Sequence, residues 1–180
     1  MTILRPIFGA AIVVAAMLAS PALTQPSSGG TTSLTADLDR DGRAETFQLR
    51  DNGESLTTLI IKALGKPEIR ARDIAWSLER ATLSRAPNGS ILLNTSHIGV
   101  GRSPHEQTLT IAYRGGAYQV VGLTRSHWDR IDQDLSTKCD INLLTGRGKV
   151  NNVSVRRSTQ GVPVTRWAWD RDLPAGCFIP

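Results

Sequence analysis

The sequence predicts an all-β protein built as a single antiparallel β-domain, either a sandwich or a partly open barrel. Three observations support this fold class. Apolar residues mostly alternate with polar ones or run in short blocks, which is typical of strands. Turn signals from glycine, asparagine and proline recur about every 8 to 15 residues. No regular alternation of strand and helix patterns appears, which disfavours a parallel α/β sheet.

The first half of the predicted domain contains three strand candidates and one short helix candidate. "ETFQLR" alternates, with Phe47 and Leu49 on one face, and "SLTTLIIKAL" at 55–64 is an apolar and β-branched run. "PEIRARDIAW" at 67–76 alternates and then shifts register. The best helix-compatible segment is "RDIAWSLERA" at 72–81.

The second half reads as a series of hairpins. Residues 81–97 are two apolar runs on either side of an Asn-Gly pair, which is the strongest short hairpin signal. Residues 106–123 repeat this logic around a Gly-Gly pair at 115–116, where positive φ permits a tight turn. "DINLLTGRGKVNNVSVRR" predicts two more strands around Gly146 and Gly148.

The N-terminus predicts an exported protein. Residues 1–22 combine a basic start, an apolar run too short to span a bilayer comfortably, and small residues suited to cleavage. Residues 23–33 read as a flexible lead-in, so the domain is expected at 34–180. We therefore expect a periplasmic or secreted protein without a stable membrane span in the mature chain. Its 21 basic and 16 acidic residues are dispersed, which argues against a nucleic-acid partner.

The chain has two cysteines, Cys139 and Cys177, and an exported chain meets an oxidising compartment. We therefore expect one disulfide bond, which would contribute about 4 kcal/mol of stability in the chain-entropy model. The alternative of a redox-active or metal-binding thiol pair is weak, because the two cysteines have no CxxC spacing.

The stretch "DLDRDGRAE" has the composition and spacing of a calcium loop. Calcium takes six to eight oxygen ligands, so a short chain must bend around the ion to supply them. The acids recur at alternate positions, and Gly42 sits where a sharp turn favours positive φ. The predicted ligands are four side chains and one backbone carbonyl, that of the arginine: Asp37, Asp39, Asp41, Arg43 and Glu45.

This stretch resembles the calcium loops of the FG-GAP/VCBS repeat family, the integrin-α type, which have the pattern D-x-D-x-D-G-x-x-D/E between strands. It does not resemble an EF-hand, because Gln48 replaces the expected glutamate and a strand pattern follows the loop. The resemblance implies a structural Ca²⁺ held in a hairpin-like turn. A single copy cannot build a propeller, so the family's architecture is not implied. An ion-free acidic turn, neutralised by Arg40 and Arg43, remains the alternative.

Other residues suggest weaker functional readings. His97 and His105 flank a glycine-rich loop, and their spacing matches no zinc signature, so we expect solvated loop histidines. His127 lies two residues before Asp129, which raises an alternative: a small periplasmic hydrolase that uses this pair or the 97–105 loop.

The aromatic residues of the second half could form either a core or a binding face. Tryptophans in strands are more often core, and the segment "VPVTRWAWD" is expected to place Thr165, Trp167 and Trp169 on one side. A binding face would use Trp128, Trp167, Trp169, Tyr113 and Tyr118. Taken together, the sequence predicts an exported, non-catalytic, calcium-stabilised binding module for a protein or glycan ligand. It leaves the ligand and the oligomeric state open.

Overall fold

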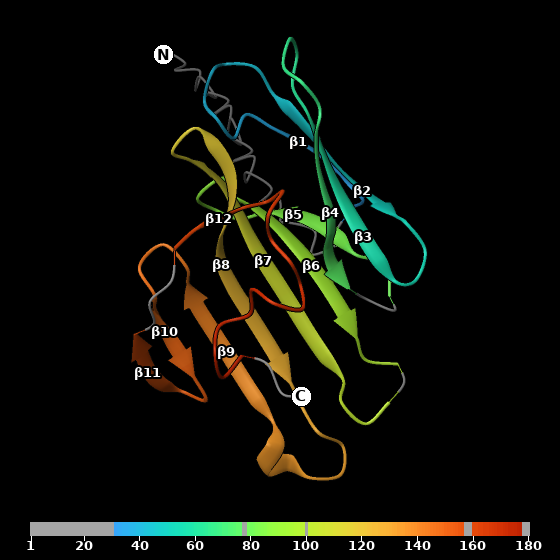
Figure 1. Ribbon diagram of the computed structural model, residues 1–180, viewed down its shortest axis with the longest axis vertical. Coiled ribbons are helices and arrows are strands. Elements are labelled where there is room, and N and C mark those ends of the chain that lie inside the picture. The colour runs from blue at the N-terminus through green and yellow to red at the C-terminus, as the bar shows by residue number, and fades with distance from the viewer. Residues whose placement is uncertain (1–30, 77–78, 100, 157–159, 178–180) are drawn as a thin grey trace, which may run out of the picture.

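The computed structural model describes residues 31–76, 79–99, 101–156 and 160–177. This part of the chain forms two antiparallel sheets, which confirms the predicted all-β fold class (Figure 1). The two sheets pack face to face, so the architecture is a sandwich. The predicted signal peptide at 1–22 lies outside the described residues.

The smaller sheet has the strand order β1-β2-β3-β4, with each strand antiparallel to the next. Its strands are β1 (Ser33–Ala36), β2 (Glu45–Asp51), β3 (Leu56–Lys62) and β4 (Ile69–Trp76). Paired structure begins at the end of the predicted lead-in, since Thr31 bridges Leu83 of the other sheet. This bridge joins the two sheets along one edge.

The larger sheet has the order β11-β10-β9-β8-β7-β6-β5, and β12 pairs with β8. Long strands at its centre, β7 and β8, carry most of the cross-strand pairing. Its elements are β5 (Thr82–Arg85), β6 (Ile91–His97), β7 (His105–Arg114), β8 (Ala117–His127), the 3₁₀ turn η1 (Gln133–Leu135), β9 (Thr137–Asn142), β10 (Arg147–Val150), β11 (Val153–Arg156) and β12 (Val162–Pro163).

One apolar core lies between the sheets. The ring of Phe47 on β2 packs edge-on against Tyr118 on β8, with ring centroids 5.9 Å apart. The fully buried aliphatic side chains come from both sheets, and each contributes roughly 1.5–3 kcal/mol by leaving water. They include Leu59, Ile61, Ile74, Leu83, Ile91, Leu93, Leu109, Ile111, Val120 and Ile141.

The turn predictions for the second half agree with the structure. β5 and β6 form a hairpin over the Asn-Gly pair, where Gly89 has φ of +87°. β7 and β8 join through Gly115 and Gly116, both at positive φ, and Arg114 pairs directly with Ala117. The helix-compatible segment at 72–81 is not a helix in its described first half, because β4 continues to Trp76. Cross-strand pairing with β3 and burial of Ile74 override a weak local helix pattern.

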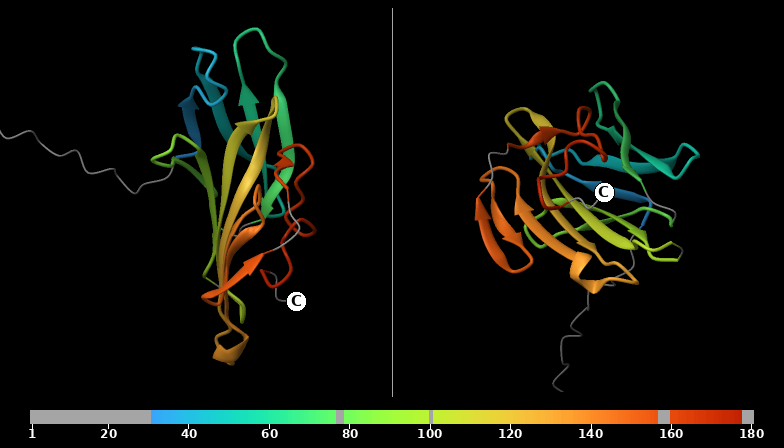
Figure 2. Two further views of the ribbon diagram at one scale, coloured as in Figure 1. Left: turned by 90° about the vertical axis from the view of Figure 1, so that its left-hand side faces the viewer. Right: turned by 60° about the horizontal axis from the view of Figure 1, so that its bottom comes forward.

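The C-terminal arm, residues 160–177, crosses the face of the larger sheet that also carries the smaller sheet (Figures 1 and 2). Only Val162–Pro163 is strand, so Thr165, Trp167 and Trp169 do not share a strand face as expected. The arm bends back at Pro163, whose carbonyl accepts hydrogen bonds from Arg166 and Trp167. The predicted disulfide, Cys139 to Cys177, fastens the arm to β9, with Cα atoms 5.4 Å apart. None of the described segments is a helix long and apolar enough to cross a membrane.

Candidate metal loop and adjoining groove

The acidic loop connects β1 to β2 at one end of the smaller sheet. Ala36 and Glu45 are paired across the two strands, so the loop begins and ends at a fixed point. Within it, the Asp37 carboxylate accepts hydrogen bonds from the backbone N–H groups of Asp41 and Gly42, both at 3.1 Å. Gly42 has φ of +85°, which lets the chain turn there without the penalty that a side chain would bring.

Glu45 is a completely buried carboxylate at the base of the loop. Its oxygens accept hydrogen bonds from the backbone N–H of Leu38 at 2.7 Å and of Asp39 at 3.4 Å. The hydroxyl of Tyr118 donates a third, at 2.8 Å, from the other sheet. Burial, and then the hydrogen bond to Glu45, raise the pKa of Tyr118, so its hydroxyl stays protonated. Glu45 thereby ties the loop to the larger sheet.

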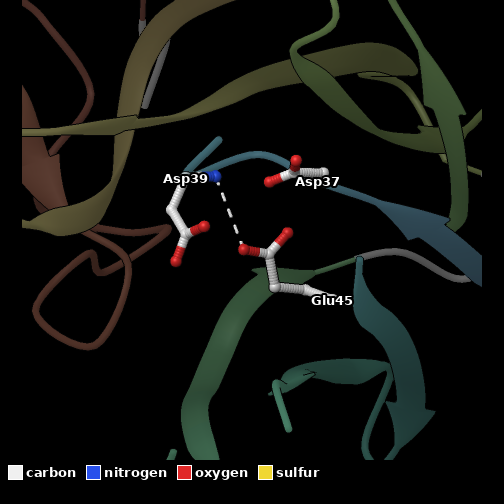
Figure 3. A group of neighbouring side chains, drawn as sticks. All are labelled: Asp37, Asp39 and Glu45. Atoms are coloured by element: carbon white, nitrogen blue, oxygen red, sulfur yellow. Dashed lines mark hydrogen bonds between the residues drawn. The ribbon is translucent and has the colours of Figure 1, made fainter. Parts of the chain in front are cut away.

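Three of the predicted ligands come together. One carboxylate oxygen from each of Asp37, Asp39 and Glu45 lies within 4.8 Å of the others (Figure 3). Among the described residues, this is the one group of three acidic, histidine or cysteine side chains that meets this distance. Oxygen ligands from carboxylates are those that Ca²⁺ prefers, so the donor set fits the ion.

Asp41 and Arg43 lie at the outer side of the loop. The Asp41 carboxylate accepts a hydrogen bond from the backbone N–H of Arg43 at 2.9 Å. Lys66, from the β3–β4 connection, forms ion pairs with both Asp39 and Asp41, the latter at 2.7 Å. Hydrogen bonding to Lys66 lowers the pKa of Asp41, and the two aspartates raise the pKa of Lys66. The loop therefore holds an ammonium cation beside its carboxylates.

A groove of about 390 Å³ opens beside the loop. Its walls are mainly apolar and aromatic, while a charged pair, Asp39 and Lys66, lines the side next to the loop. The remaining lining residues are Pro67, Ile69, Tyr113, Gly116, Ala117, Tyr118, Pro163, Val164 and Thr165. Asp39 thus belongs to both the loop and the groove, and Tyr118 connects the two, because it lines the groove and its hydroxyl donates to Glu45.

The expectation that His97 and His105 are solvated loop residues is wrong, because His97 is half-buried at the end of β6 and His105 is buried at the start of β7. His105 and His127 are each only 7 % exposed, because they lie at strand ends on the inner face of the larger sheet. No His127–Asp129 hydrogen bond is present: Nδ1 of His127 has no partner among the described residues. The Asp129 carboxylate instead accepts hydrogen bonds from Arg102 and from the backbone N–H groups of Ile131 and Asp132. These contacts give no support to an acid/base pair.

The loop between β6 and β7 is held against the segment after β8. The Arg130 guanidinium donates to the carbonyls of Ile98 and Gly101, and Arg102 pairs with Asp129 at 2.7 Å. Both segments project from the same end of the molecule (Figure 2). The guanidinium groups of Arg102 and Arg130 are therefore used in contacts between these two segments.

The sequence analysis missed Lys66 as a site residue, and it named Tyr118 only as a candidate for an aromatic binding face, without its link to the loop. Lys66 follows the motif by more than twenty residues, and Tyr118 belongs to the other sheet. No local pattern links either residue to the loop. For Lys66, the nearest signal is a lone lysine in the "GKP" turn after an apolar strand.

The comparisons with known proteins leave the family open. No protein-family model matches the chain, and searches of curated proteins and of solved structures found no significant match either. Functional inference therefore rests on the geometry of the chain itself.

Proposed function

We propose that this chain is an exported, non-catalytic binding module in which a calcium ion in the acidic loop stabilises an adjoining ligand groove. The proposal rests on two links between the loop and the groove. Asp39 lines the groove and belongs to the acidic cluster, and Tyr118 lines the groove and donates a hydrogen bond to Glu45. A change in the loop's charge would therefore reach the groove wall directly. The resemblance to FG-GAP/VCBS loops and the oxygen donor set favour calcium over other ions.

The carboxylates of Asp37, Asp39 and Glu45 would hold the ion, with Asp41 and the backbone carbonyl of Arg43 completing the ligand set. Lys66 is the competitor for this position, since its ammonium already neutralises Asp39 and Asp41. Calcium and Lys66 would repel each other, so ion binding would weaken the two ion pairs. Lys66 would then present its charge to the groove that it lines.

Export is part of the same proposal. Residues 1–22 have the pattern of a signal peptide, and the Cys139–Cys177 bond suits an oxidising compartment. The groove has the size and apolar lining of a small-ligand or peptide site, and a protein segment or glycan is the expected occupant.

Calcium titration of the mature protein tests the proposal. With a Kd near 10⁻⁴ M, about 1 mM Ca²⁺ would add roughly 1.4 kcal/mol of stability, which raises the melting temperature by a few degrees. Asp39→Asn should abolish this rise. Asp134→Asn removes an exposed acid from η1, outside the loop, and should leave the rise unchanged, which controls for the change in net charge.

Lys66→Gln sharpens the test. Removing the competing ammonium should tighten calcium binding, because the carboxylates then have no cation to release. Absence of any calcium heat in both the wild type and Lys66→Gln would show that the loop is an ion-free turn and would remove the basis of the proposal.

A further inference from the structure

The three histidines of the chain lie in one row across the larger sheet. His97 ends β6, His105 begins β7 and His127 ends β8. The strand register pairs His97 with His105, and His105 with His127. Directly paired residues on neighbouring antiparallel strands have Cβ atoms about 4.5–5.5 Å apart. Three imidazole rings that are distant in sequence are therefore immediate neighbours.

Two tryptophans cover this row. The ring centroid of Trp76, at the end of β4, lies 4.9 Å from that of His97 and 5.8 Å from that of His105. Trp169 of the C-terminal arm stacks on Trp76 at 5.9 Å. The row is thus enclosed by the larger sheet below, the smaller sheet's last strand above, and the arm.

Two buried ring nitrogens of the row lack partners among the described residues. Nδ1 of His97 and Nδ1 of His127 are buried and have no hydrogen bond among the described residues. His105 uses one ring nitrogen in a hydrogen bond with the backbone of Ser103. Buried polar atoms are nearly always satisfied, so these nitrogens call for a ligand, ion or water. A histidine that bonds the backbone through one nitrogen and leaves the other free has the arrangement of a metal ligand.

The protonation state also suits metal binding. Burial, the Arg125 guanidinium and His97 lower the pKa of His105 to about 4. Burial and Arg125 likewise lower the pKa of His127. Neutral imidazole is the form that binds metal ions, so at neutral pH no proton would have to leave these two rings.

We propose that His97, His105 and His127 form a binding site for a borderline transition-metal ion such as Zn²⁺ or Cu²⁺. The centroids of His97 and His105 are 5.5 Å apart. Two imidazoles on one tetrahedral ion, with metal–nitrogen distances of about 2.0–2.1 Å, would place their centroids about 5 Å apart. The nitrogens of all three rings do not yet lie within 4.8 Å of one another, so binding requires side-chain rotation to close the site.

The positive charge of Arg125 limits the affinity of the histidine row for a metal ion. Arg125 occupies the next inward position on β8 from His127, and its guanidinium donates to the Gln107 side chain at 2.8 Å without an acidic partner among the described residues. Its charge opposes any cation nearby. The same positive charge lowers the pKa of His105 and of His127, so that fewer protons compete with the metal for their ring nitrogens.

This site is independent of the calcium loop. The loop offers carboxylate oxygens, which suit Ca²⁺, whereas the row offers imidazole nitrogens, which suit Zn²⁺, Cu²⁺, Co²⁺ and Ni²⁺. The two sites share no residue. Failure of either proposal therefore leaves the other standing.

A titration of the tag-free, chelator-treated mature protein with Co²⁺ and Cu²⁺ tests the site. We expect one equivalent of Co²⁺ to give the visible absorption of a nitrogen-coordinated ion, and Cu²⁺ to quench Trp76, which touches His97. Trp76→Phe should remove most of that quenching without removing the Co²⁺ absorption. His105→Gln and His127→Gln should each weaken binding by at least about tenfold, as loss of a ligand does.

Two controls separate the site from the loop and from unfolding. Asp39→Asn should bind Co²⁺ as the wild type does, and the histidine variants should keep the wild-type calcium response. Binding weaker than about 10⁻⁴ M, or equal binding by wild type and both histidine variants, would overturn the proposal. Loss of Co²⁺ binding in Asp39→Asn would also overturn it, because the ion would then sit in the loop.

Discussion

The acidic loop and the histidine row are both polar clusters of one sandwich, but they differ in how their buried atoms are satisfied. Every oxygen of Glu45 has a donor, two from the loop backbone and one from Tyr118. In the row, Nδ1 of His97 and Nδ1 of His127 have no donor or acceptor partner among the residues that the structure describes. The buried carboxylate at the base of the loop is thus satisfied by the protein's own donors, whereas the row has buried ring nitrogens without partners among the described residues.

The difference follows from the local backbone. Between β1 and β2 the chain is not paired, so its N–H groups are free to turn inward toward carboxylates. At the row, the strands already use their backbone groups in the ladder with their neighbours. Side chains on the sheet face can then be satisfied only by other side chains, water or a ligand. A loop can solvate a buried charge in a way that a sheet face cannot.

The largest expected loss of stability comes from replacing Glu45, whose carboxylate oxygens both have donors. Glu45→Ala removes a buried carboxylate and leaves its three donors, one of them buried and two partly buried, without an acceptor; it should lower the free energy of unfolding by about 3–5 kcal/mol. Tyr118→Phe removes one donor only and should cost about 1–2 kcal/mol. Denaturant unfolding of both variants measures the two values. Equal losses would mean that the backbone donors of Leu38 and Asp39 contribute little.

The disulfide that fastens the arm near the row should have the next largest effect. Replacing Cys139 and Cys177 by alanine together should cost about 2–4 kcal/mol, since the unfolded chain gains freedom. Because the arm carries Trp169, tryptophan fluorescence should change with the loss of the Trp76 stack. An unchanged spectrum would show that the arm stays docked without the bond.

A pH titration measures how much the buried histidine row contributes to the pH dependence of stability. His105 has a folded pKa of about 4 against an ordinary value of 6.5, so between these values the unfolded state binds more protons. In the metal-free protein, the free energy of unfolding should fall by about 2–3 kcal/mol as pH drops from 6.5 to 4, and then lose no more from this residue. His105→Gln should flatten that interval in chelator-containing buffer. A slope that persists in the variant would place the titrating group elsewhere.

The smallest change in stability is expected from replacing His127, whose Nδ1 has no partner among the described residues. His127→Leu removes a buried nitrogen that has no partner, so the metal-free protein should change by less than about 1 kcal/mol, toward higher stability. The contrast with Glu45→Ala is the sharpest form of the comparison. Thermal unfolding of the two variants side by side checks it, and a large loss for His127→Leu would reveal a partner such as ordered water.

The fold was largely predictable because its signals are local. Alternation of apolar and polar residues marked β2 and β7, and the Asn-Gly and Gly-Gly pairs marked the turns. These signals are local because strand patterning and positive φ depend on neighbouring residues. The end of β4 was compatible with a helix by its local pattern for the opposite reason: its strand form depends on pairing with β3, which is not visible in the residues themselves. The arm was misread for a similar reason, since its course depends on docking and on the disulfide.

The sequence by itself determined the antiparallel all-β class, the cysteine pair and the acidic loop, because strand period, cysteine count and ligand spacing can all be read along the chain. The choice of a sandwich over a partly open barrel came from the tertiary structure. Only the tertiary structure brought Lys66 and Tyr118 to the loop and placed three histidines side by side. In a hairpin, the residues that pair are those that lie equally far from the turn, however far apart they are in the sequence. The row of histidines therefore becomes visible only when β6, β7 and β8 are aligned.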